Sequence, residues 1–334
     1  MAAMNLNLPI TTPVYIDGSK LRSLISYPSL LNHLQTTLPV ISTKIESPIR
    51  HNHSVNQSSS LLLMPSWSQS DSFQYIGVKI VTTFPENSSR NFPGVHASYL
   101  LFDSLTGKPL SIMDGSELTH WRTSCVSGLA SKYLSRNDVE VLVMIGAGSL
   151  AEYLIKAHLC VRPSLKRVII WNRNGEKAVN LVKKLQDEGI SGVGFEYGEC
   201  LQEIVKVGDV ISCATSSGNP IVKGVELKEG VHLDLVGSFT PLMRECDDEA
   251  IKRGKVFVDN EAALVEAGEL VGAFSRGVIA KEEICGSLID LITGKKNGRN
   301  GDNEITVFKS VGSAVVDIAS AQLVYETYLE KNNF

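Results

Sequence analysis

The sequence predicts an α/β fold in two domains: a Rossmann-type domain with a doubly wound parallel sheet, and an α+β domain completed by the C-terminal helix. Two observations support this prediction. From residue 141 onward, a glycine-rich turn joins an apolar strand to a helix, and strands then alternate with helices. The first 115 or so residues instead show strand-like alternation between turns rich in Ser, Asn and Pro.

Length and composition fit this organisation and exclude several classes of protein. The 334 residues are 43% hydrophobic and 20% charged, which suits a globular protein of about two domains. The net charge of −4 and the pI near 6.0 give no reason to expect a nucleic acid or an anionic membrane as partner. No apolar run approaches the length of a membrane span.

Six cysteines are scattered without a Cys-x-x-Cys pair or a nearby cluster of histidines. This pattern predicts reduced, buried thiols and argues against a disulfide framework or a zinc site. The six are Cys125, Cys160, Cys200, Cys213, Cys246 and Cys285.

In the first domain, alternation predicts strands at Tyr75–Thr83 and Ser98–Phe102. The polar stretch at residues 52–60 predicts a turn. His51 and His53 could share one face of a strand, but their neighbours are polar, so a surface loop is the preferred interpretation.

Two basic residues occupy positions that need a partner. Lys79 is flanked by apolar residues in its predicted strand, and a buried ammonium costs several kcal/mol unless a partner compensates. Lys79 should therefore reach solvent at a sheet edge or face an anion in a cleft. Arg122 lies in a helix that begins near Ser116, where it could serve a function or form a solvated stripe with Lys132 and Arg136.

Residues 141–171 predict a βαβ unit with strands at Val141–Ile145 and Val168–Trp171. In the turn, Gly146 permits the tight passage from strand to helix, and Gly148 lets the backbone approach a pyrophosphate at the helix N-terminus. Ala151 allows helix and strand to pack closely. The turn residues predicted to contact the dinucleotide are Gly146, Ala147, Gly148, Ser149 and Leu150.

The end of the second strand bears on which dinucleotide binds. An NAD-dependent enzyme usually has Asp or Glu there, which accepts hydrogen bonds from the ribose 2′-hydroxyl. This sequence has Asn172, Arg173 and Asn174. A guanidinium pairs with a 2′-phosphate, so NADPH is the predicted cofactor and NADH a weaker one. The alternative is that Arg173 is a solvated loop residue.

The remaining elements complete the second domain. A helix is predicted at Glu176–Glu188, and strands at Asp209–Ala214, His232–Val236 and Lys255–Asp259. Ligands bind outside the carboxyl ends of parallel strands. The residues expected to border the cofactor there are Cys213, Ala214, Thr215, Ser216, Val236, Gly237 and Ser238. The amphipathic helix at Ser313–Glu330 should pack on the first domain, since the sheet is already complete.

Several segments together resemble the ornithine cyclodeaminase/mu-crystallin family, in order and over nearly the whole chain. They are Ser47–Arg50, Leu62–Pro65, Gly77–Lys79, Arg122–Thr123, Gly146–Gly148, Asn172–Arg173, His232–Gly237 and Phe308–Gly312. Within the family, Leu62–Ser68 and Cys246–Asp248 are most similar to the plant reductases that make pipecolate from dehydropipecolate.

The resemblance implies a separate function for each of the two domains. Arg50, Lys79 and Arg122 would converge on a substrate carboxylate between the domains, and the nicotinamide would lie near Ser310 and Val236. The first domain, residues 1–121 with 313–334, would bind substrate and form a homodimer. The second, residues 122–312, would bind the dinucleotide, with Thr123 among its contacts.

Two departures from the family narrow the expected activity. Deaminating members carry acidic residues at the positions of Leu62 and Phe239, and both carboxylates are missing here. The sequence therefore predicts NADPH-dependent reduction of Δ1-piperideine-2-carboxylate to pipecolate. The alternatives are reduction of Δ1-pyrroline-2-carboxylate to proline, cyclodeamination of ornithine, which is the least favoured, and a mu-crystallin-like NADPH-dependent ligand-binding protein. The group that protonates the imine nitrogen is left open.

The resemblance also implies a plastid protein with a place in plant lysine catabolism and systemic acquired resistance. Met1–Thr37 is not the Arg- and Ser-rich leader expected of a transit peptide, and Val14–Leu38 reads as part of the fold. A cytosolic location is the alternative.

Overall fold

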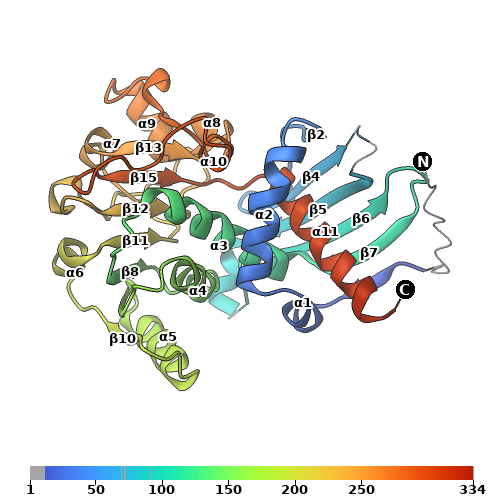
Figure 1. Ribbon diagram of the computed structural model, residues 1–334, viewed down its shortest axis with the longest axis horizontal. Coiled ribbons are helices and arrows are strands. Elements are labelled where there is room, and N and C mark those ends of the chain that lie inside the picture. The colour runs from blue at the N-terminus through green and yellow to red at the C-terminus, as the bar shows by residue number, and fades with distance from the viewer. Residues whose placement is uncertain (1–11, 69, 71–72, 91, 334) are drawn as a thin grey trace. The chain divides into compact units, whose positions relative to one another are not determined.

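The computed structural model describes residues 12–333 except residues 69, 71, 72 and 91. Its internal contacts divide the chain into two compact units, which are described separately. Unit 1 contains Met1–Arg122 and Ala314–Phe334, and unit 2 contains Thr123–Ser313 (Figure 1). The boundaries expected from the sequence lie one residue earlier at both junctions.

The comparison of Met1–Thr37 with a transit peptide rests partly on residues 1–11, which lie outside the described residues. Val14–Leu38 belongs to the fold of unit 1, as predicted, because it falls within three elements of regular structure. These are β1 (Val14–Ile16), α1 (Gly18–Leu24) and α2 (Tyr27–Ile41).

Unit 1 contains a seven-stranded sheet in the order β1-β7-β6-β5-β4-β2, with β3 paired to β4. The β1–β7 pair is parallel and the other pairs are antiparallel. The further strands are β2 (Ile45–Glu46), β3 (His51–Ser54), β4 (Ser60–Ser68), β5 (Tyr75–Thr83), β6 (Val95–Asp103) and β7 (Pro109–Asp114). A 3₁₀ helix, η1 (Pro85–Arg90), joins β5 to β6.

One face of this sheet is covered by α11 (Ala314–Lys331), and α2 packs on α11. Helix α11 contacts β4, β5 and β6 (Figure 1). The prediction that the helix near residues 313–330 packs on the first domain is therefore confirmed. Alternation along the strands sends one set of side chains into this layer, including Met64, Tyr99 and Met113, all 8% exposed or less.

The loop prediction for His51 and His53 is wrong. Both residues lie in β3, which pairs with β4 from His51 opposite Leu63 to Ser54 opposite Ser60. All four residues of β3 are exposed. A two-sided polar strand at a sheet edge has no apolar alternation, so its periodicity could not distinguish it from a loop.

Unit 2 contains an eight-stranded, entirely parallel sheet in the order β10-β9-β8-β11-β12-β15-β13-β14. The strands are β8 (Val141–Ile145), β9 (Arg167–Trp171), β10 (Gly194–Tyr197), β11 (Val210–Cys213), β12 (His232–Leu235), β13 (Lys255–Val258), β14 (Gly286–Ser287) and β15 (Thr306–Lys309). The predicted Rossmann-type α/β class is confirmed.

Helices cover both faces of the parallel sheet, as a doubly wound fold requires. Leu142 and Met144 of β8 face one buried core, and Val143 and Ile145 face the other. The helices are α3 (Gly115–Leu134, shared with unit 1), α4 (Ala151–Val161), α5 (Gly175–Asp187), α6 (Leu201–Val207), α7 (Asp248–Arg253), α8 (Ala263–Glu266), α9 (Gly268–Ser275) and α10 (Leu288–Ile292), with 3₁₀ helices at Gly224–Glu226 and Lys281–Glu283.

The sheet is complete before Ser313, as expected, but its strand at residues 306–309 was not predicted. Strand β15 is inserted between β12 and β13, and its four residues are all buried. An all-buried strand of a parallel sheet has no alternation, so this short run resembled a connection to the following helix.

The prediction of buried cysteines holds for only half of them. Cys125, Cys213 and Cys246 are buried, whereas Cys160 and Cys200 are exposed and Cys285 is partly exposed. All six are free thiols. Cys200 caps the start of α6 at the surface, a position that scattered spacing in the sequence does not reveal. Within the described ranges, no helix is long and apolar enough to cross a bilayer.

Candidate active site

The glycine turn of unit 2 has the geometry that its sequence predicts. Gly146 has a φ of +106°, and a Cβ there would lie 2.5 Å from the carbonyl oxygen of Ala214. Only glycine fits both constraints. A Cβ on Gly148 would meet nothing within 4 Å, so space for a ligand lies directly beside the backbone. Ala151 is fully buried where α4 begins.

Asn172 links this turn to the end of β9. Its Oδ1 accepts a hydrogen bond from the Ala147 N–H (3.1 Å), and its Nδ2 donates to the Asn174 carbonyl (2.9 Å). Asn174 then caps α5 through the Glu176 N–H. Arg173, between the two asparagines, is exposed. The carboxylate typical of NAD-dependent enzymes is absent from residues 172–174.

A hollow of about 320 Å³ lies beside the glycine turn. One side consists of the turn itself, and the other is α5, which contributes Lys177 and Lys184. The full lining is Ala147, Gly148, Ser149, Glu152, Lys177, Asn180, Leu181 and Lys184. Lys184 is paired with Glu152 (2.5 Å), so the charge of Lys177 is the more available of the two for an anion.

The other predicted cofactor residues follow neighbouring strands of the same sheet. Cys213, Ala214 and Thr215 end or follow β11, Val236 follows β12, and Ser310 follows β15. Because β8, β11, β12 and β15 are adjacent and parallel, these residues share one edge of the sheet with the glycine turn. Leu150 is the N-cap residue of α4. Thr123 is buried within α3. It precedes the first strand of this sheet in the sequence, so it does not follow a strand end as the other residues do.

Two buried carboxylates hold the loops at this edge through hydrogen bonds. Neither was among the site residues predicted from the sequence. Asp259 accepts hydrogen bonds from the Ser310 hydroxyl (3.0 Å) and from the backbone N–H groups of Val311 and Gly312. Glu245 accepts hydrogen bonds from the loops after β11 and β12. Both residues are 8% exposed or less.

In unit 1, Lys79 and Arg122 are joined by a third residue, Asp317 of α11. Lys79 Nζ lies 2.7 Å from Asp317 Oδ2, and Arg122 Nε lies 2.9 Å from Asp317 Oδ1. All three side chains are buried, at 7% exposed or less. Lys79 lies in a central strand, so the sheet-edge alternative is wrong. Arg122 is also not part of a solvated stripe.

Electrostatics make Lys79 an unusual lysine. Burial lowers its pKa to about 8; Asp317 opposes this effect, while Arg122 and Arg50 add to it. Burial would raise the pKa of Asp317, but Lys79 and Arg122 outweigh burial and hold it below its ordinary value. Arg50 therefore acts on the same cluster, from the segment between β2 and β3.

The cluster can bind an anion and exchange a proton. Three cations, Arg50, Lys79 and Arg122, act on the single carboxylate of Asp317, so the cluster carries more basic than acidic side chains. A lysine whose pKa lies near 8 can hold a proton at neutral pH and release it readily. A perturbed pKa with an identified charged partner is typical of functional sites.

Leu62 lies on the same face of the sheet as Lys79. In the β4–β5 register, Lys79 is opposite Met64 and Leu62 is opposite Val81, two positions further along each strand. An apolar side chain therefore stands beside the cationic cluster, at one of the two positions where the family resemblance implies an acid in deaminating members. Phe239, at the other of these positions, is 42% exposed in the loop after β12. No group of three or more His, Cys, Asp or Glu side chains in the described ranges could hold a metal ion.

The fold and these residues define a dinucleotide-binding α/β protein that also carries a buried, anion-binding cluster. The chain belongs to the ornithine cyclodeaminase/mu-crystallin family, whose model matches residues 18–332. The resemblance inferred from the sequence is thereby confirmed.

Known relatives match nearly the whole chain. Protein SAR DEFICIENT 4 of Arabidopsis thaliana is 56% identical over 320 residues, covering 96% of this chain and 98% of its own. The structure of the Thermococcus litoralis Δ1-pyrroline-2-carboxylate reductase in complex with NADH and L-proline superposes with a TM-score of 0.90 at 33% identity, covering 96% of this chain and 98% of that one. An archaeal alanine dehydrogenase dimer with bound NAD has a TM-score of 0.87 at 30% identity, covering 96% and 97%.

Proposed function

We propose that the protein is an NADPH-dependent reductase of a cyclic imino acid, Δ1-piperideine-2-carboxylate, and that it forms pipecolate. The observation that carries the proposal is the buried cluster of Lys79, Arg122 and Asp317, on which the charge of Arg50 also acts. The cluster occurs in a chain 33% identical to a reductase solved with NADH and L-proline, a cyclic amino acid.

Each residue of the cluster has a task in this reaction. Arg50 and Arg122 bind the substrate carboxylate by charge-assisted hydrogen bonds, which orient the ring. Asp317 holds Lys79 and Arg122 side by side. When bound, the reduced nicotinamide supplies a hydride to the imine carbon. Lys79 holds the proton that the imine nitrogen needs, so the C=N bond gains one hydride and one proton and becomes the amine of the product.

The apolar side chains at Leu62 and Phe239 favour an imine over a diamine. An ammonium opposite Leu62 would lose its hydration without gaining a partner. We therefore expect no ammonia release from ornithine with catalytic NAD, under conditions in which the cyclic imine is reduced. Steady ammonia production would overturn the reductase proposal.

The five-membered Δ1-pyrroline-2-carboxylate is the second candidate substrate, because L-proline occupies the Thermococcus litoralis relative. The 56% identity with the Arabidopsis protein, together with the plant-type segments at Leu62–Ser68 and Cys246–Asp248, favours the six-membered ring. On the same basis we propose a plastid location and a role in plant defence. A fluorescent fusion in leaf cells that is confined to the cytosol would contradict the location.

The preference for NADPH rests on positive charge beside the glycine turn. Arg173 is exposed between two asparagines, and Lys177 lines the adjacent hollow. Both could pair with a 2′-phosphate, and residues 172–174 contain no carboxylate that would repel one. The solved relatives contain NADH or NAD, so NADH is expected to be accepted more weakly rather than excluded.

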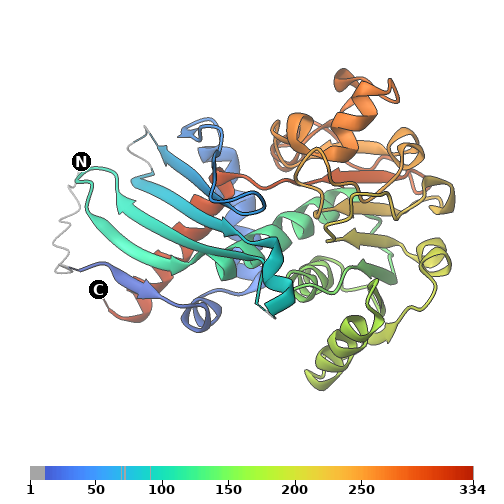
Figure 2. The same ribbon diagram turned by 180° about the vertical axis from the view of Figure 1, so that it is seen from behind.

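A homodimer through the sheet of unit 1 is proposed from its second face. Pro65, Val78, Leu100, Ile112 and Tyr15 lie opposite one another across five strands, and none of them is buried. Figure 2 shows this side of strands β4 to β7 without α2 or α11 over it. A second copy is the proposed occupant, since a related alanine dehydrogenase is a dimer. Ile112→Glu should shift the sedimentation coefficient to that of a monomer.

The direct test measures NADPH oxidation with each cyclic imine and identifies the product by mass spectrometry. Turnover to pipecolate, with the larger kcat/KM for the six-membered imine, is the expected result. A larger kcat/KM for the five-membered imine would move the protein to the second candidate. NADPH binding without turnover of either imine would indicate a ligand-binding protein instead.

A further inference from the structure

Glu245 connects the ends of two neighbouring strands in unit 2. Its Oε1 accepts hydrogen bonds from the Thr215 N–H (2.6 Å) and the Thr215 hydroxyl (2.9 Å), and its Oε2 accepts one from the Gly237 N–H (2.7 Å). Thr215 and Gly237 each stand two residues beyond the last residue of their strands, β11 and β12. One carboxylate therefore sets the spacing of both loops.

Gly237 shows how closely these loops approach each other. A Cβ at that position would lie 2.0 Å from the Thr215 carbonyl oxygen and 2.5 Å from Glu245 Oε1. No other residue would fit without moving backbone. The loops are thus built around the Glu245 carboxylate, which is fully buried.

The groups facing Glu245 leave its charge only partly balanced. Lys309, at the end of β15, and Glu269, on α9, are both fully buried, with Lys309 Nζ 3.5 Å from Glu269 Oε2. Glu269 Oε1 also accepts a hydrogen bond from the Glu245 N–H (2.6 Å). The thiols of Cys213 and Cys246 also lie close to it, and burial raises the pKa of each well above its ordinary value. Two carboxylates thus share one ammonium.

We infer that Glu245 is a positioning residue for the bound dinucleotide: its carboxylate holds the Thr215 and Gly237 loops in the spacing that the nicotinamide half requires, and its protonation weakens binding. The inference rests on the proposed cofactor role of unit 2. It goes beyond that role by assigning the pH dependence of cofactor binding to one buried side chain that need not touch the cofactor.

The titration of Glu245 falls in an accessible range. Burial raises its pKa to about 7; Lys309 opposes the rise and Glu269 adds to it. Below this pH the carboxyl group is protonated, so it keeps fewer lone pairs for the three donors of the two loops. Cofactor affinity should then fall as the pH falls through 7.

The test measures dissociation constants for NADH by fluorescence titration from pH 6 to 8.5. NADH is the probe because the 2′-phosphate of NADPH itself titrates near pH 6, as phosphate monoesters do. For the unmodified protein, the Kd should rise as the pH is lowered through about 7. A constant Kd across this range would overturn the inference, whereas no binding of either NADH or NADPH would instead overturn the proposed function.

Glu245→Gln should raise the Kd at pH 8 by about tenfold, because one loop loses its charged acceptor. It should also abolish the pH dependence. Glu269→Gln keeps the oxygen that accepts from the Glu245 N–H and removes a like charge, so the midpoint of the pH dependence should move to lower pH. An unchanged midpoint in Glu269→Gln would overturn the inference even if Glu245→Gln failed to fold.

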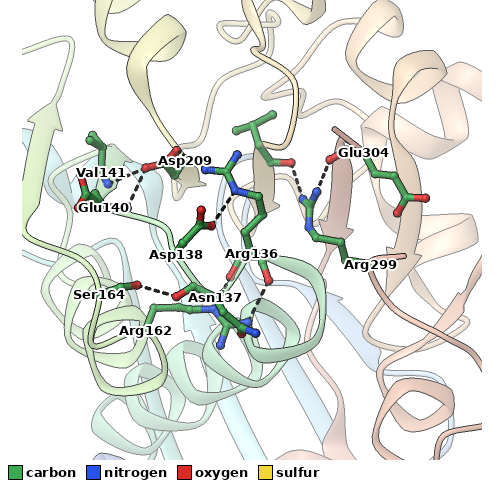
Figure 3. A network of polar contacts seen from close by, with 12 residues as sticks. Arg136, Asn137, Asp138, Glu140, Val141, Arg162, Ser164, Asp209, Arg299 and Glu304 are labelled. Carbon is green, nitrogen blue, oxygen red and sulfur yellow. Dashed lines mark hydrogen bonds and ion pairs between the residues drawn. The ribbon is translucent and has the colours of Figure 1, made fainter. Parts of the chain in front are cut away.

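The matched control is Asp209→Asn, at the opposite edge of the same sheet. Asp209 also ties two neighbouring strands, through the N–H groups of Glu140 and Val141 (Figure 3). Its loss should leave the Kd for NADH and its pH dependence unchanged. If Asp209→Asn weakened NADH binding as much as Glu245→Gln does, the effect would be a general consequence of loosening the sheet, and the positioning role would be refuted.

Discussion

The two edges of the parallel sheet in unit 2 are each fastened by a carboxylate, but in opposite electrostatic conditions. At the amino edge, Asp209 accepts two backbone hydrogen bonds and pairs with Lys228 (2.7 Å) and Arg136 (3.3 Å). Burial would raise its pKa, but Lys228 and the backbone donors hold it below its ordinary value. At the carboxyl edge, burial prevails at Glu245 and raises its pKa to about 7.

The direction of each pKa shift determines whether the ionised carboxylate stabilises or destabilises the fold. A lowered acid pKa means that ionised Asp209 stabilises the fold above the unfolded-state pKa, and that this contribution is lost as the pH falls through the folded-state pKa. A raised acid pKa means that ionised Glu245 destabilises the fold above about pH 7. A buried charge that destabilises the fold is typical of a functional site.

Lys79 in unit 1 resembles Glu245 in this respect. Its pKa is lowered to about 8, so its charged form destabilises the fold below that pH, and stability should increase as the pH rises through 8. The proposed reaction needs the charged form. For both residues, therefore, function and stability should change with pH in opposite directions.

The largest expected effect comes from removing the charge of Lys79 in unit 1. Lys79→Met should lower kcat/KM for the cyclic imine by about 10³-fold, because the proton that the imine nitrogen needs is lost. The melting temperature should change little, since Arg122 still pairs with Asp317 and an apolar chain of similar length replaces a desolvated ammonium. Steady-state kinetics and calorimetry check both parts. Unfolding of the variant would mean that Lys79 is a structural ion-pair residue.

The amino edge should respond in the opposite way. Asp209→Asn removes a charge that pairs with Lys228 and Arg136, so the free energy of unfolding should fall by about 2 kcal/mol, with kcat/KM unchanged. Urea denaturation measures the loss. Equal stability losses in Asp209→Asn and Glu245→Gln would erase the difference between the two edges.

A smaller effect should sharpen the role assigned to Asp317. In Asp317→Asn, the charge that favours protonated Lys79 is gone, so the pKa of Lys79 should fall further. Activity is present when Lys79 is protonated and is lost as the pH rises through its pKa, so the alkaline limb of the kcat/KM profile should move to lower pH. We expect a loss of about tenfold at pH 7 and a smaller loss at pH 6. An unmoved limb would contradict the proton-holding role of Lys79.

The smallest effect is expected at the exposed Arg173. Arg173→Ala should raise the KM for NADPH by about fivefold and leave the KM for NADH unchanged, because solvent screens a surface contact. Lys183→Ala, which removes an exposed cation from α5 outside the hollow, is the control and should change neither value. Equal losses for both cofactors in Arg173→Ala would contradict the NADPH assignment.

Features that depend on neighbouring residues were predictable from the sequence. The βαβ unit and Gly146 follow from local turn chemistry, and the structure reproduces both. That Lys79 needs either solvent or an anion was also predictable, because a buried ammonium must be compensated. The identity of that anion was not, since Asp317 is 238 residues away in the sequence. An acid within the apolar start of α11 was the available signal.

Strand β15 and the role of Glu245 were not predicted for the same reason, because their partners are distant in the sequence. β15 joins strands that precede it by up to 74 residues, counted from His232 to Thr306, and Glu245 meets Thr215 across a separation of 30 residues. Periodicity describes one element at a time and contains no information about such pairings. The site residues that a single sequence reveals are thus those whose chemistry is local, whereas the residues that hold them in place become visible only in three dimensions.

The position of β15 also determines when this protein can fold. The sheet of unit 2 has a gap between β12 and β13 until residues 306–309 have been synthesised, and unit 1 lacks α11 until residue 331. Many multidomain proteins fold one domain after another as the ribosome releases them. Here neither unit can close its core during most of translation, so both must finish folding at the same late stage, with apolar strands exposed to chaperones until then.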